Sequence, residues 1–343
     1  MLDKSRLAII AGLIRAHISI SDVEKYCKET GISREDFVPI SPRRFDGQVF
    51  AIDGSNVVIC DWSVASLNLI RAGYAVYRGT EWQRTVITYD DIFLADCKSY
   101  VQQFDDCLEG IFGLKGIVLK DAELERLSSY FRELQEYVAL YDAVYQADPG
   151  DLILYDGGFT WKELPLGDVL RKIFRAAERK GVDILGISKS SSISWGEEVS
   201  RPFLQNTAYA AGLLRPGVPW RLCLSKKKVN PDPDKWKGGK IYVARLDGRC
   251  EHAFRVDAPV HVEDRIDEAL GKLAGCSCSA ECRGYPHALF RAHRDIRITD
   301  QEGGFLMLRL MDVLGEMGLS EAEVRGALLD FHDVIEMKQR KPA

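Results

Sequence analysis

Two aspartates each end an apolar run that reads as a buried strand. Asp53 closes the run in VFAIDGSN (residues 49–56), and Asp156 closes the run in LILYDGG (152–158). If these strands lie side by side, the two carboxylates meet, and carboxylates about 4 to 6 Å apart need a proton or a cation between them. Hard oxygen ligands suit Mg²⁺ or Mn²⁺, and such sites commonly carry out phosphoryl transfer with one or two metal ions. The alternative is that each Asp-Gly pair is an ordinary hairpin turn.

A histidine and a tyrosine near the other end of the chain are further candidates. The segment RGYPHALFRAH (283–293) predicts a helix that begins near Pro286, a favoured first-turn proline. Tyr285 and His293 are eight residues apart, just over two helical turns, so they can share one face. His293 could bind Mn²⁺ as a neutral imidazole, and Tyr285 could donate a hydrogen bond to a phosphate or to a metal-bound water. The alternative is a satisfied core histidine beside a packing aromatic.

Basic residues give two candidate contacts with DNA. Lys189, in GISKS, follows a predicted strand parallel to that of Asp156, so its ammonium could reach a phosphate. The segment 225–240 is polar, rich in proline and glycine, and should be an exposed loop whose lysines attract phosphates while its tryptophan stacks on an unpaired base. The residues concerned are Lys226, Lys227, Lys228, Lys235, Lys237, Lys240 and Trp236. The alternatives are a solvated lysine at a strand end and a solvated loop.

The chain has nine cysteines, and we expect reduced thiols in a reducing compartment. Cys276, Cys278 and Cys282 are close enough in sequence to share a metal, with Cys250 or His287 as a further ligand. Their spacing matches no common zinc pattern, so the alternatives are a structural zinc or iron–sulfur site and unliganded thiols.

Composition sets outer limits on the function. The 343 residues, 46% hydrophobic and 28% charged, predict a globular protein with a substantial core. A net charge of −5 gives no whole-chain case for nucleic acid, so any basic surface must be local. We expect no signal peptide, no membrane span and a cytoplasmic location. An apolar stripe near the N-terminus predicts intramolecular packing, or dimerisation or partner contact; its residues are Leu2, Leu7, Ile9, Ile10 and Ile14.

The hydrophobic pattern predicts an α/β protein. Residues 3–30 read as helices, 48–119 as a β-meander of short strands, 121–146 as a long helix capped by Asp121, 152–188 as a β-α-β unit, 241–257 as strands and 303–340 as helices. This order is that of a ribonuclease H-like mixed sheet with flanking helices. We expect one domain over 1–343, with a helical arm (1–40), a ribonuclease H-like core (41–300) and C-terminal helices (301–343).

As a whole the chain resembles the NurA nucleases. The matching features are AIDGSN, FRELQEY, LILYDGGF, ILGISKS and GYPHALFRAH, in that order between residues 48 and 295. The resemblance implies a ribonuclease H-like fold and Mn²⁺-dependent exonuclease and endonuclease activity on DNA, with Mg²⁺ as a possible substitute and no organic cofactor. It also implies a homodimer that works with a hexameric HerA-type ATPase in DNA end resection.

Carried onto this sequence, the resemblance implies that Asp53, Asp156, His293 and Glu136 bind the metal and that Tyr285 is also catalytic. Helical geometry leaves the glutamate open. The apolar seam of the long helix faces away from Glu136, whereas Glu133 lies nearer its edge, so Glu133 stays an alternative.

One position departs from the family pattern. Gly158 stands where the family usually has a serine, which costs a hydrogen bond but no ligand. The sequence therefore predicts a metal-dependent deoxyribonuclease. Alternatives are a non-catalytic scaffold with the same fold that binds an ATPase or a DNA end, and a ribonuclease H-like enzyme that acts on RNA.

Overall fold

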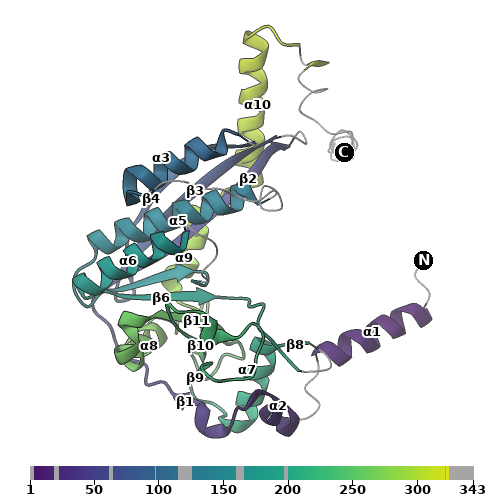
Figure 1. The fold of residues 1–343 in the computed structure, drawn as a ribbon, viewed down its shortest axis with the longest axis vertical. Helices are drawn as coiled ribbons and strands as arrows, with labels where there is room; N and C mark the ends of the chain where they lie inside the picture. Colours follow the sequence, from purple (N-terminus) through teal and green to yellow (C-terminus); the bar gives the residue numbers. More distant parts are fainter. Residues whose placement is uncertain are drawn as a thin grey trace.

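The computed structural model describes residues 4–18, 23–61, 65–96, 98–114, 126–159, 166–196, 200–320 and 322–323. A single nine-stranded mixed sheet organises this part of the chain, in the order β1-β9-β10-β11-β6-β5-β2-β3-β4 (Figure 1). Its strands are β1 (Val38–Pro39), β2 (Gln48–Asp61), β3 (Ala65–Arg78), β4 (Glu81–Asp96), β5 (Leu152–Asp156), β6 (Asp183–Ser188), β9 (Trp220–Cys223), β10 (Gly239–Arg245) and β11 (Phe254–Pro259). A separate hairpin pairs β7 (Ser194–Trp195) with β8 (Arg201–Pro202).

The parallel part of the sheet is its centre. β2 pairs in parallel with β5, and β5 pairs in parallel with β6, while the remaining pairs of this sheet are antiparallel. The predicted β-α-β unit is therefore confirmed, with α6 (Leu166–Lys180) as its crossover helix. Because both parallel pairs end at the same edge, the carboxyl ends of β5 and β6 lie together there.

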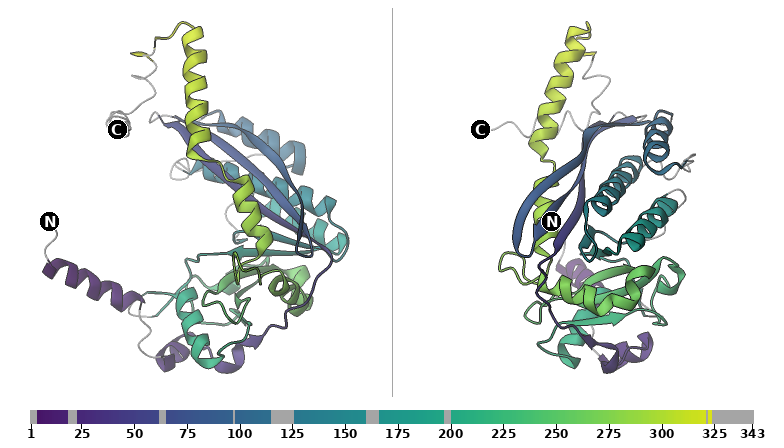
Figure 2. Two further views of the ribbon diagram at one scale, coloured as in Figure 1. Left: turned by 180° about the vertical axis from the view of Figure 1, so that it is seen from behind. Right: turned by 90° about the vertical axis from the view of Figure 1, so that its left-hand side faces the viewer.

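Helices cover both faces of the sheet (Figure 2). α5 and α6 lie on one face, with α3 beside them, and α9 lies on the other. The other helices have the following bounds: α1 (Lys4–Ile18), α2 (Val23–Thr30), α3 (Tyr100–Phe112), α5 (Leu127–Gln146), α7 (Phe203–Leu214), α8 (Ile266–Gly275), α9 (His287–Ile296), α10 (Asp300–Glu316) and the 3₁₀ turns η1 (Arg34–Asp36), η2 (Pro233–Lys235) and η3 (Val260–Arg265).

Alternation along β2 divides the buried residues into two cores. Phe50 and Ile52 pack with α5 and α6, whereas Val49 and Ala51 pack with α8 and α9. Successive side chains of a strand point to opposite faces, so this period places the next odd-numbered residue, Asp53, on the α9 face. The same alternation in β5 puts Leu152 and Leu154 on the α9 face, and Asp156 follows them.

The β-meander differs from the prediction in strand length. β2 does not stop at Asp53 but continues through Gly54 and Ser55 to Asp61. β3 pairs with β2 over this whole length, from Gln48 to Asp61. The backbone at Gly54 and Ser55 is therefore paired with a neighbouring strand and stays extended. The predicted end of the strand was wrong, and so was the hairpin-turn alternative at this position.

One helix replaces predicted strand. Residues 100–112 form α3, although 48–119 was predicted to be β. Its buried residues are spaced four apart, which is helical: Tyr100, Phe104, Leu108 and Phe112. The predicted cap at Asp121 and the end of the predicted C-terminal helices, 324–343, lie outside the described residues.

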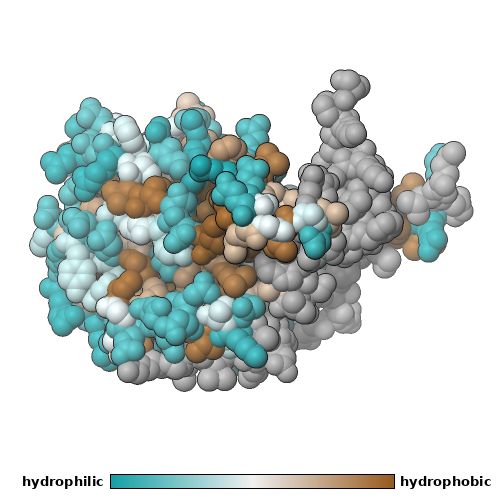
Figure 3. Space-filling model, turned by 90° about the horizontal axis from the view of Figure 1, so that it is seen from above, coloured by the Kyte–Doolittle hydropathy of each residue, from teal (hydrophilic) through white to brown (hydrophobic). Residues whose placement is uncertain are grey.

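Both outer helices expose apolar side chains. On α1, Leu7, Ile9, Ile10 and Ile14 are exposed, so the intramolecular packing expected of them is not observed; Leu2 lies outside the described residues. On α10, Phe305 and Leu308 are exposed too. Figure 3 views the molecule from the end at which α10 lies, and hydrophobic residues lie between hydrophilic ones on that face. In the described part of the chain, no helix combines the length and the hydropathy that a bilayer crossing requires.

Candidate metal centre and active site

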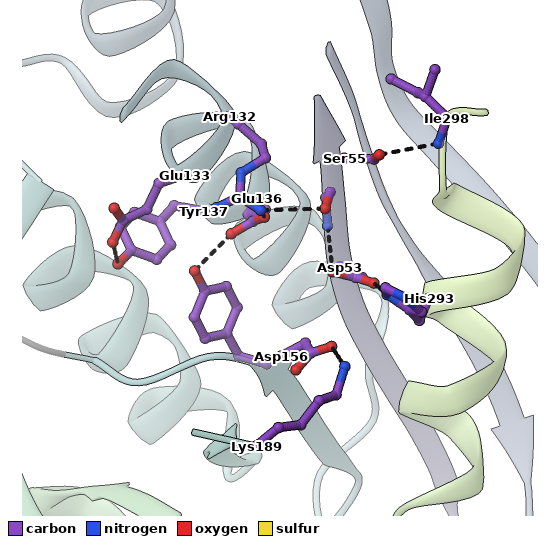
Figure 4. Close-up of polar contacts among 12 residues, drawn as sticks. Asp53, Ser55, Arg132, Glu133, Glu136, Tyr137, Asp156, Lys189, His293 and Ile298 are labelled. Carbon is purple, nitrogen blue, oxygen red and sulfur yellow. Dashed lines mark hydrogen bonds and ion pairs between the residues drawn. The ribbon is translucent and has the colours of Figure 1, made fainter. Parts of the chain in front are cut away.

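Asp53 and Asp156 are neighbours across two parallel strands. β2 and β5 pair with Ile52 opposite Tyr155, and the two aspartates are the next residues of their strands. Asp53 and Asp156 each offer one carboxylate oxygen, and His293 one ring nitrogen; these three atoms lie within 4.8 Å of one another. Figure 4 shows the aspartates projecting between β2, β5 and α9. The predicted convergence of the two carboxylates is confirmed, although Asp53 lies within β2 and not at its end.

The histidine reaches this point because α9 is anchored against β2. Pro286 is the N-cap of α9, close to the predicted start of the helix. The apolar face of α9 is buried in the second core, through Ala288, Leu289, Ala292 and Ile296. Just after the helix, the amide of Ile298 donates a hydrogen bond of 3.0 Å to the Ser55 hydroxyl. With both the helix face and its exit fixed, His293 Nδ1 lies 3.0 Å from Asp53 Oδ2.

The two carboxylates have different surroundings. Burial and the charge of Asp156 raise the pKa of Asp53, although Gly54 N–H donates to its Oδ1 at 2.8 Å. Asp156 has a counter-ion, since Lys189 Nζ lies 2.7 Å from its Oδ2. Asp53 and Asp156 therefore still repel each other in part, and a bound cation would relieve this repulsion.

Tyr285 lies beside the same carboxylates. Burial and the charges of Asp156 and Asp53 raise the pKa of its hydroxyl far above the usual range. The Lys189 ammonium lies 5.1 Å from the centre of its ring. Its hydroxyl is buried, but no group in the described ranges completes a hydrogen bond with it. A polar hydroxyl left unpaired at the edge of an acidic cluster is suited to a ligand oxygen.

Glu136, which the resemblance implied as a further metal ligand, lies on the opposite face of the sheet and is not among the three groups whose ligand atoms converge in the described part of the chain. Its side chain is buried against Gly54, and it accepts a hydrogen bond of 2.7 Å from Tyr155, which faces α5. Arg132 Nη1 lies 3.4 Å from its Oε1. Burial raises the pKa of Glu136 to about 7, against the opposing effects of Arg132 and Tyr155.

Glu133 points elsewhere. It accepts a hydrogen bond of 2.7 Å from Tyr137 on the same helix, on the side of α5 away from β2 (Figure 4). Of the two glutamates, Glu136 is thus the one beside Asp53. The hydrophobic pattern of the long helix favoured Glu133 because we assumed that this helix buries only one narrow apolar stripe. The helix instead packs on β2, β3 and α6 together, and buries Gln135, Glu136 and Tyr137 in succession.

A buried ion pair below the Asp156 loop was not anticipated. Arg255 Nε lies 2.7 Å from Asp257 Oδ1, and Asp257 Oδ2 accepts a hydrogen bond of 2.8 Å from Phe159 N. Both charged side chains are buried, and a β-carbon on Gly158 would lie 3.0 Å from Asp257 Oδ2. The pair therefore holds the chain directly after Asp156. The sequence signal was the presence of two charges inside the strand FRVDAP (254–259).

The lysine-rich loop joins β9 to β10, as a hairpin connection, but it is a poorer DNA surface than predicted. Trp236 is buried in the first core, so the stacking role given to it was wrong. Lys227 pairs with Asp36 at 2.8 Å, and Lys240 pairs with Glu263 at 2.7 Å. The loop folds back on η1 and η3. These two ion pairs neutralise lysine charges that were predicted to contact DNA. Lys226 remains exposed, as does Lys228.

The four cysteines do not converge on a metal. In the described ranges, the cluster of Asp53, Asp156 and His293 is the one group of three metal-ligating side chains within coordinating reach. Cys276 is buried and Cys278 is exposed, while Cys250 packs on Gly284. Of the two alternatives, the structure favours unliganded thiols.

The family assignment comes from the comparisons with known proteins. A family model described as NurA domain matches residues 47–298, which contain every residue of the site described above. The chain belongs to the NurA family. The comparison with curated proteins gives no match.

Of three solved structures, one supports the fold of this NurA chain and two match it more weakly. The NurA nuclease from Sulfolobus solfataricus superposes with a TM-score of 0.57 at 16% identity, over 94% of this chain and 99% of that one. Ciona intestinalis Endonuclease V in complex with an inosine-containing DNA gives a TM-score of 0.36 at 14% identity, over 80% and 96%. The catalytic domain of human Endonuclease V gives 0.33 at 12% identity, over 76% and 89%. The fold is ribonuclease H-like, as the sequence predicted.

Proposed function

We propose that this NurA-family protein is a divalent-metal-dependent deoxyribonuclease that hydrolyses phosphodiester bonds. The observation that carries the proposal is the convergence of Asp53, Asp156 and His293 from β2, the end of β5 and α9. Two carboxylates and an imidazole form a donor set for a divalent cation. The raised pKa of Asp53 and the unpaired Tyr285 hydroxyl fit the same view.

The donor set also bears on which metal binds. Carboxylates accept Mg²⁺ and Mn²⁺ alike, whereas an imidazole ligand suits Mn²⁺ better than Mg²⁺. We therefore propose Mn²⁺ as the preferred ion, with Mg²⁺ as a weaker substitute. When bound, the cation would supply Lewis-acid stabilisation of the charge that develops on the phosphate.

The side chains around the ligands have separate roles in the proposal. The Tyr285 hydroxyl donates to a non-bridging phosphate oxygen, and the Lys189 ammonium neutralises charge on the same group. Glu136, with a pKa of about 7, is buried beside Asp53 on the other face of β2, and in the proposal it accepts a proton during hydrolysis. Arg132 and Tyr155 hold that carboxylate in place.

We further propose the finer family properties. These are exonuclease and single-strand endonuclease activity, a homodimer, and joint work with a hexameric HerA-type ATPase in DNA end resection. Family membership supports them, and the exposed apolar residues of α1 and α10 would be natural contact surfaces. Light scattering of the purified protein, alone and mixed with such an ATPase, tests both associations.

Cleavage of end-labelled single- and double-stranded DNA with Mn²⁺, Mg²⁺ or a chelator tests the activity. We expect cleavage with Mn²⁺ and none with chelator or in Asp53→Asn. Because Asp53 is under repulsion from Asp156, removing its charge should leave the metal-free fold intact, and circular dichroism checks this. Asp264→Asn, at an exposed position of η3, is the matched control and should cleave normally. Cleavage that persists in the chelator would instead favour a site without a metal, and complete inactivity of the wild type would favour a scaffold.

A further inference from the structure

A cavity of about 680 Å³ opens between α7 and the loop that joins β10 to β11. α7 lies beside the end of the sheet that contains β9 and β10 (Figure 1). The cavity volume falls within the range of small-molecule sites, roughly 300 to 1,000 Å³. None of the functional assignments above uses it, apart from Lys189, which lies on its wall.

The cavity has an apolar interior with an aromatic ring on one side. α7 contributes Leu204, Ala208, Tyr209 and Leu213, and the opposite wall includes Phe254. The exposed fractions of Tyr209 and Leu213 are 55% and 61%, which is unusual for large side chains on a helix that otherwise packs inward. An aromatic face left open in a concave, apolar site can stack on a flat ring.

The rim of the cavity is polar. Gln205, Glu251 and His252 line it from two sides and can exchange hydrogen bonds with a heterocycle. Arg245 also lines it, but its guanidinium is already bonded to the carbonyl oxygens of Arg215 and Val218. Because one lining residue is acidic, Arg245 is bonded to carbonyl oxygens and Lys189 is paired with Asp156, the cavity is poorly suited to hold a phosphate group.

Lys189 and Phe254 connect the wall of the cavity to the acidic cluster. Lys189 lines it and also lies 2.7 Å from Asp156, and the β10–β11 loop ends at Phe254, which packs on Tyr285. β6 and β11 pair with Ser188 opposite Arg255, so this loop lies at the sheet edge where β5 and β6 end. A strand of DNA whose phosphate lies at Asp53 and Asp156 would pass Lys189, which lines the cavity.

We propose that this cavity receives the base of an unpaired nucleotide next to the scissile phosphate, with Tyr209 stacking on it. The inference rests on the proposed nuclease function and specifies its substrate as a single strand or an unpaired end. A paired base has its polar edge and both faces occupied in the duplex, so it must leave the stack before it can enter the cavity and stack on Tyr209. Stacking on an aromatic ring is tolerant of sequence, so the site would accept any of the four bases.

The fold offers a variant that fills the cavity without disturbing its walls. Gly212 lies on α7 and lines the cavity, and a β-carbon there meets nothing within 4 Å. Gly212→Phe should project a ring into the space while it favours the helix over the wild-type glycine. Gly110→Phe on α3 is the matched control, since that glycine is also helical with open space around its β-carbon. Tyr209→Ala and Tyr209→Phe test the stacking face itself.

Binding is measured in chelator, on single-stranded DNA with 2-aminopurine at successive positions, by anisotropy and base fluorescence. We expect one position to be quenched in the wild type, in Tyr209→Phe and in Gly110→Phe. Gly212→Phe and Tyr209→Ala should lose that quenching and bind about tenfold more weakly, as expected for removal of one base stack. With Mn²⁺ added, both should lose more activity on single strands than on blunt duplexes.

The outcomes separate this proposal from the nuclease proposal. Wild-type quenching and affinity in Gly212→Phe would overturn the base site, whether or not the protein cuts DNA. If the quenching pattern is as expected but the wild type cleaves no DNA with any metal, the base site stands and the nuclease function fails.

Discussion

The carboxylate of Glu136 occupies the space in which a side chain on Gly54 would begin. An ideal β-carbon at Gly54 would lie 2.4 Å from Glu136 Oε1 and 2.6 Å from its Cγ. Gly54 also donates its amide to Asp53, so the same residue fixes one carboxylate and makes room for another. Glycine at this position therefore allows the acidic cluster to include a side chain from the other face of the sheet.

Gly54→Ala should displace Glu136 while it leaves Asp53, Asp156 and His293 in place. Because a misplacement of about 1 Å in a catalytic group can cost on the order of 100-fold in rate, we expect a loss of this size in DNA cleavage with Mn²⁺ affinity retained. Gly110→Ala is the control and should be fully active. An active Gly54→Ala enzyme would show that Glu136 has no catalytic part.

Lys189→Met should separate metal binding from catalysis. The ammonium is the counter-ion of Asp156 and competes with a cation for it, so its removal should raise Mn²⁺ affinity by a few-fold. The effect should be small because the Lys189 side chain is 45% exposed and its charge is screened by solvent. Cleavage should fall by about 100-fold, as for the loss of one charge-stabilising donor. Titration calorimetry and a cleavage assay measure the two effects, with Lys28→Met, at an exposed position of α2, as the control. Weaker metal binding in Lys189→Met would rule out this competition.

Glu136→Gln should change how stability depends on pH in the metal-free protein. Folding raises the pKa of Glu136 from 4.5 to about 7, so the native state keeps a proton that the unfolded chain releases between these values. The resulting stabilisation is complete below pH 4.5 and is lost as pH rises through 7. The variant lacks this dependence.

Urea unfolding in chelator at pH 5 and pH 8 measures the effect. The stability of Glu136→Gln relative to wild type should increase by about 2.5 kcal/mol between the two pH values. A constant difference would mean that Glu136 ionises normally in its buried position.

Breaking the Arg255–Asp257 pair should lower the free energy of unfolding, and replacing both residues by apolar ones should lower the cleavage activity. Asp257→Asn leaves the buried Arg255 without a counter-charge and should cost about 3 kcal/mol in unfolding free energy. The double variant Arg255→Met/Asp257→Leu should recover most of that loss, since a buried pair can be exchanged for apolar residues at little cost. It still leaves Phe159 N without its acceptor, so cleavage should remain slow. A fully active double variant would show that the pair does not position the Asp156 loop.

The meeting of Asp53 and Asp156 was predictable because it depends on short-range information. Two apolar runs of four residues, each followed by an aspartate, suffice to bring the carboxylates together once the two strands pair in parallel, although Asp53 lies within β2 and not at its end. The start of α9 was predictable for a similar reason, through Pro286. These features follow from local sequence and from the rules of parallel sheets.

What could not be predicted depends on contacts with distant segments. β2 continues past Gly54 because β3 pairs with it there, and the local sequence GSNVVI does not predict this pairing. Trp236 is buried because its loop folds back onto the core, although its lysine-rich neighbours indicate an exposed surface. Glu136 is buried because three elements enclose α5, a crowding that the hydrophobic period of one helix does not reveal.

The central claim, that Asp53, Asp156 and His293 form one cation site, is tested most directly by Mn²⁺ binding. The electron paramagnetic resonance signal of free Mn²⁺ is followed as wild type, Asp53→Asn, Asp156→Asn, His293→Ala and the control Asp264→Asn are added. We predict that wild type and Asp264→Asn remove the free-ion signal at the same protein concentration, and that each of the other three variants leaves most of it. Wild-type Mn²⁺ binding in Asp53→Asn and Asp156→Asn would contradict the account.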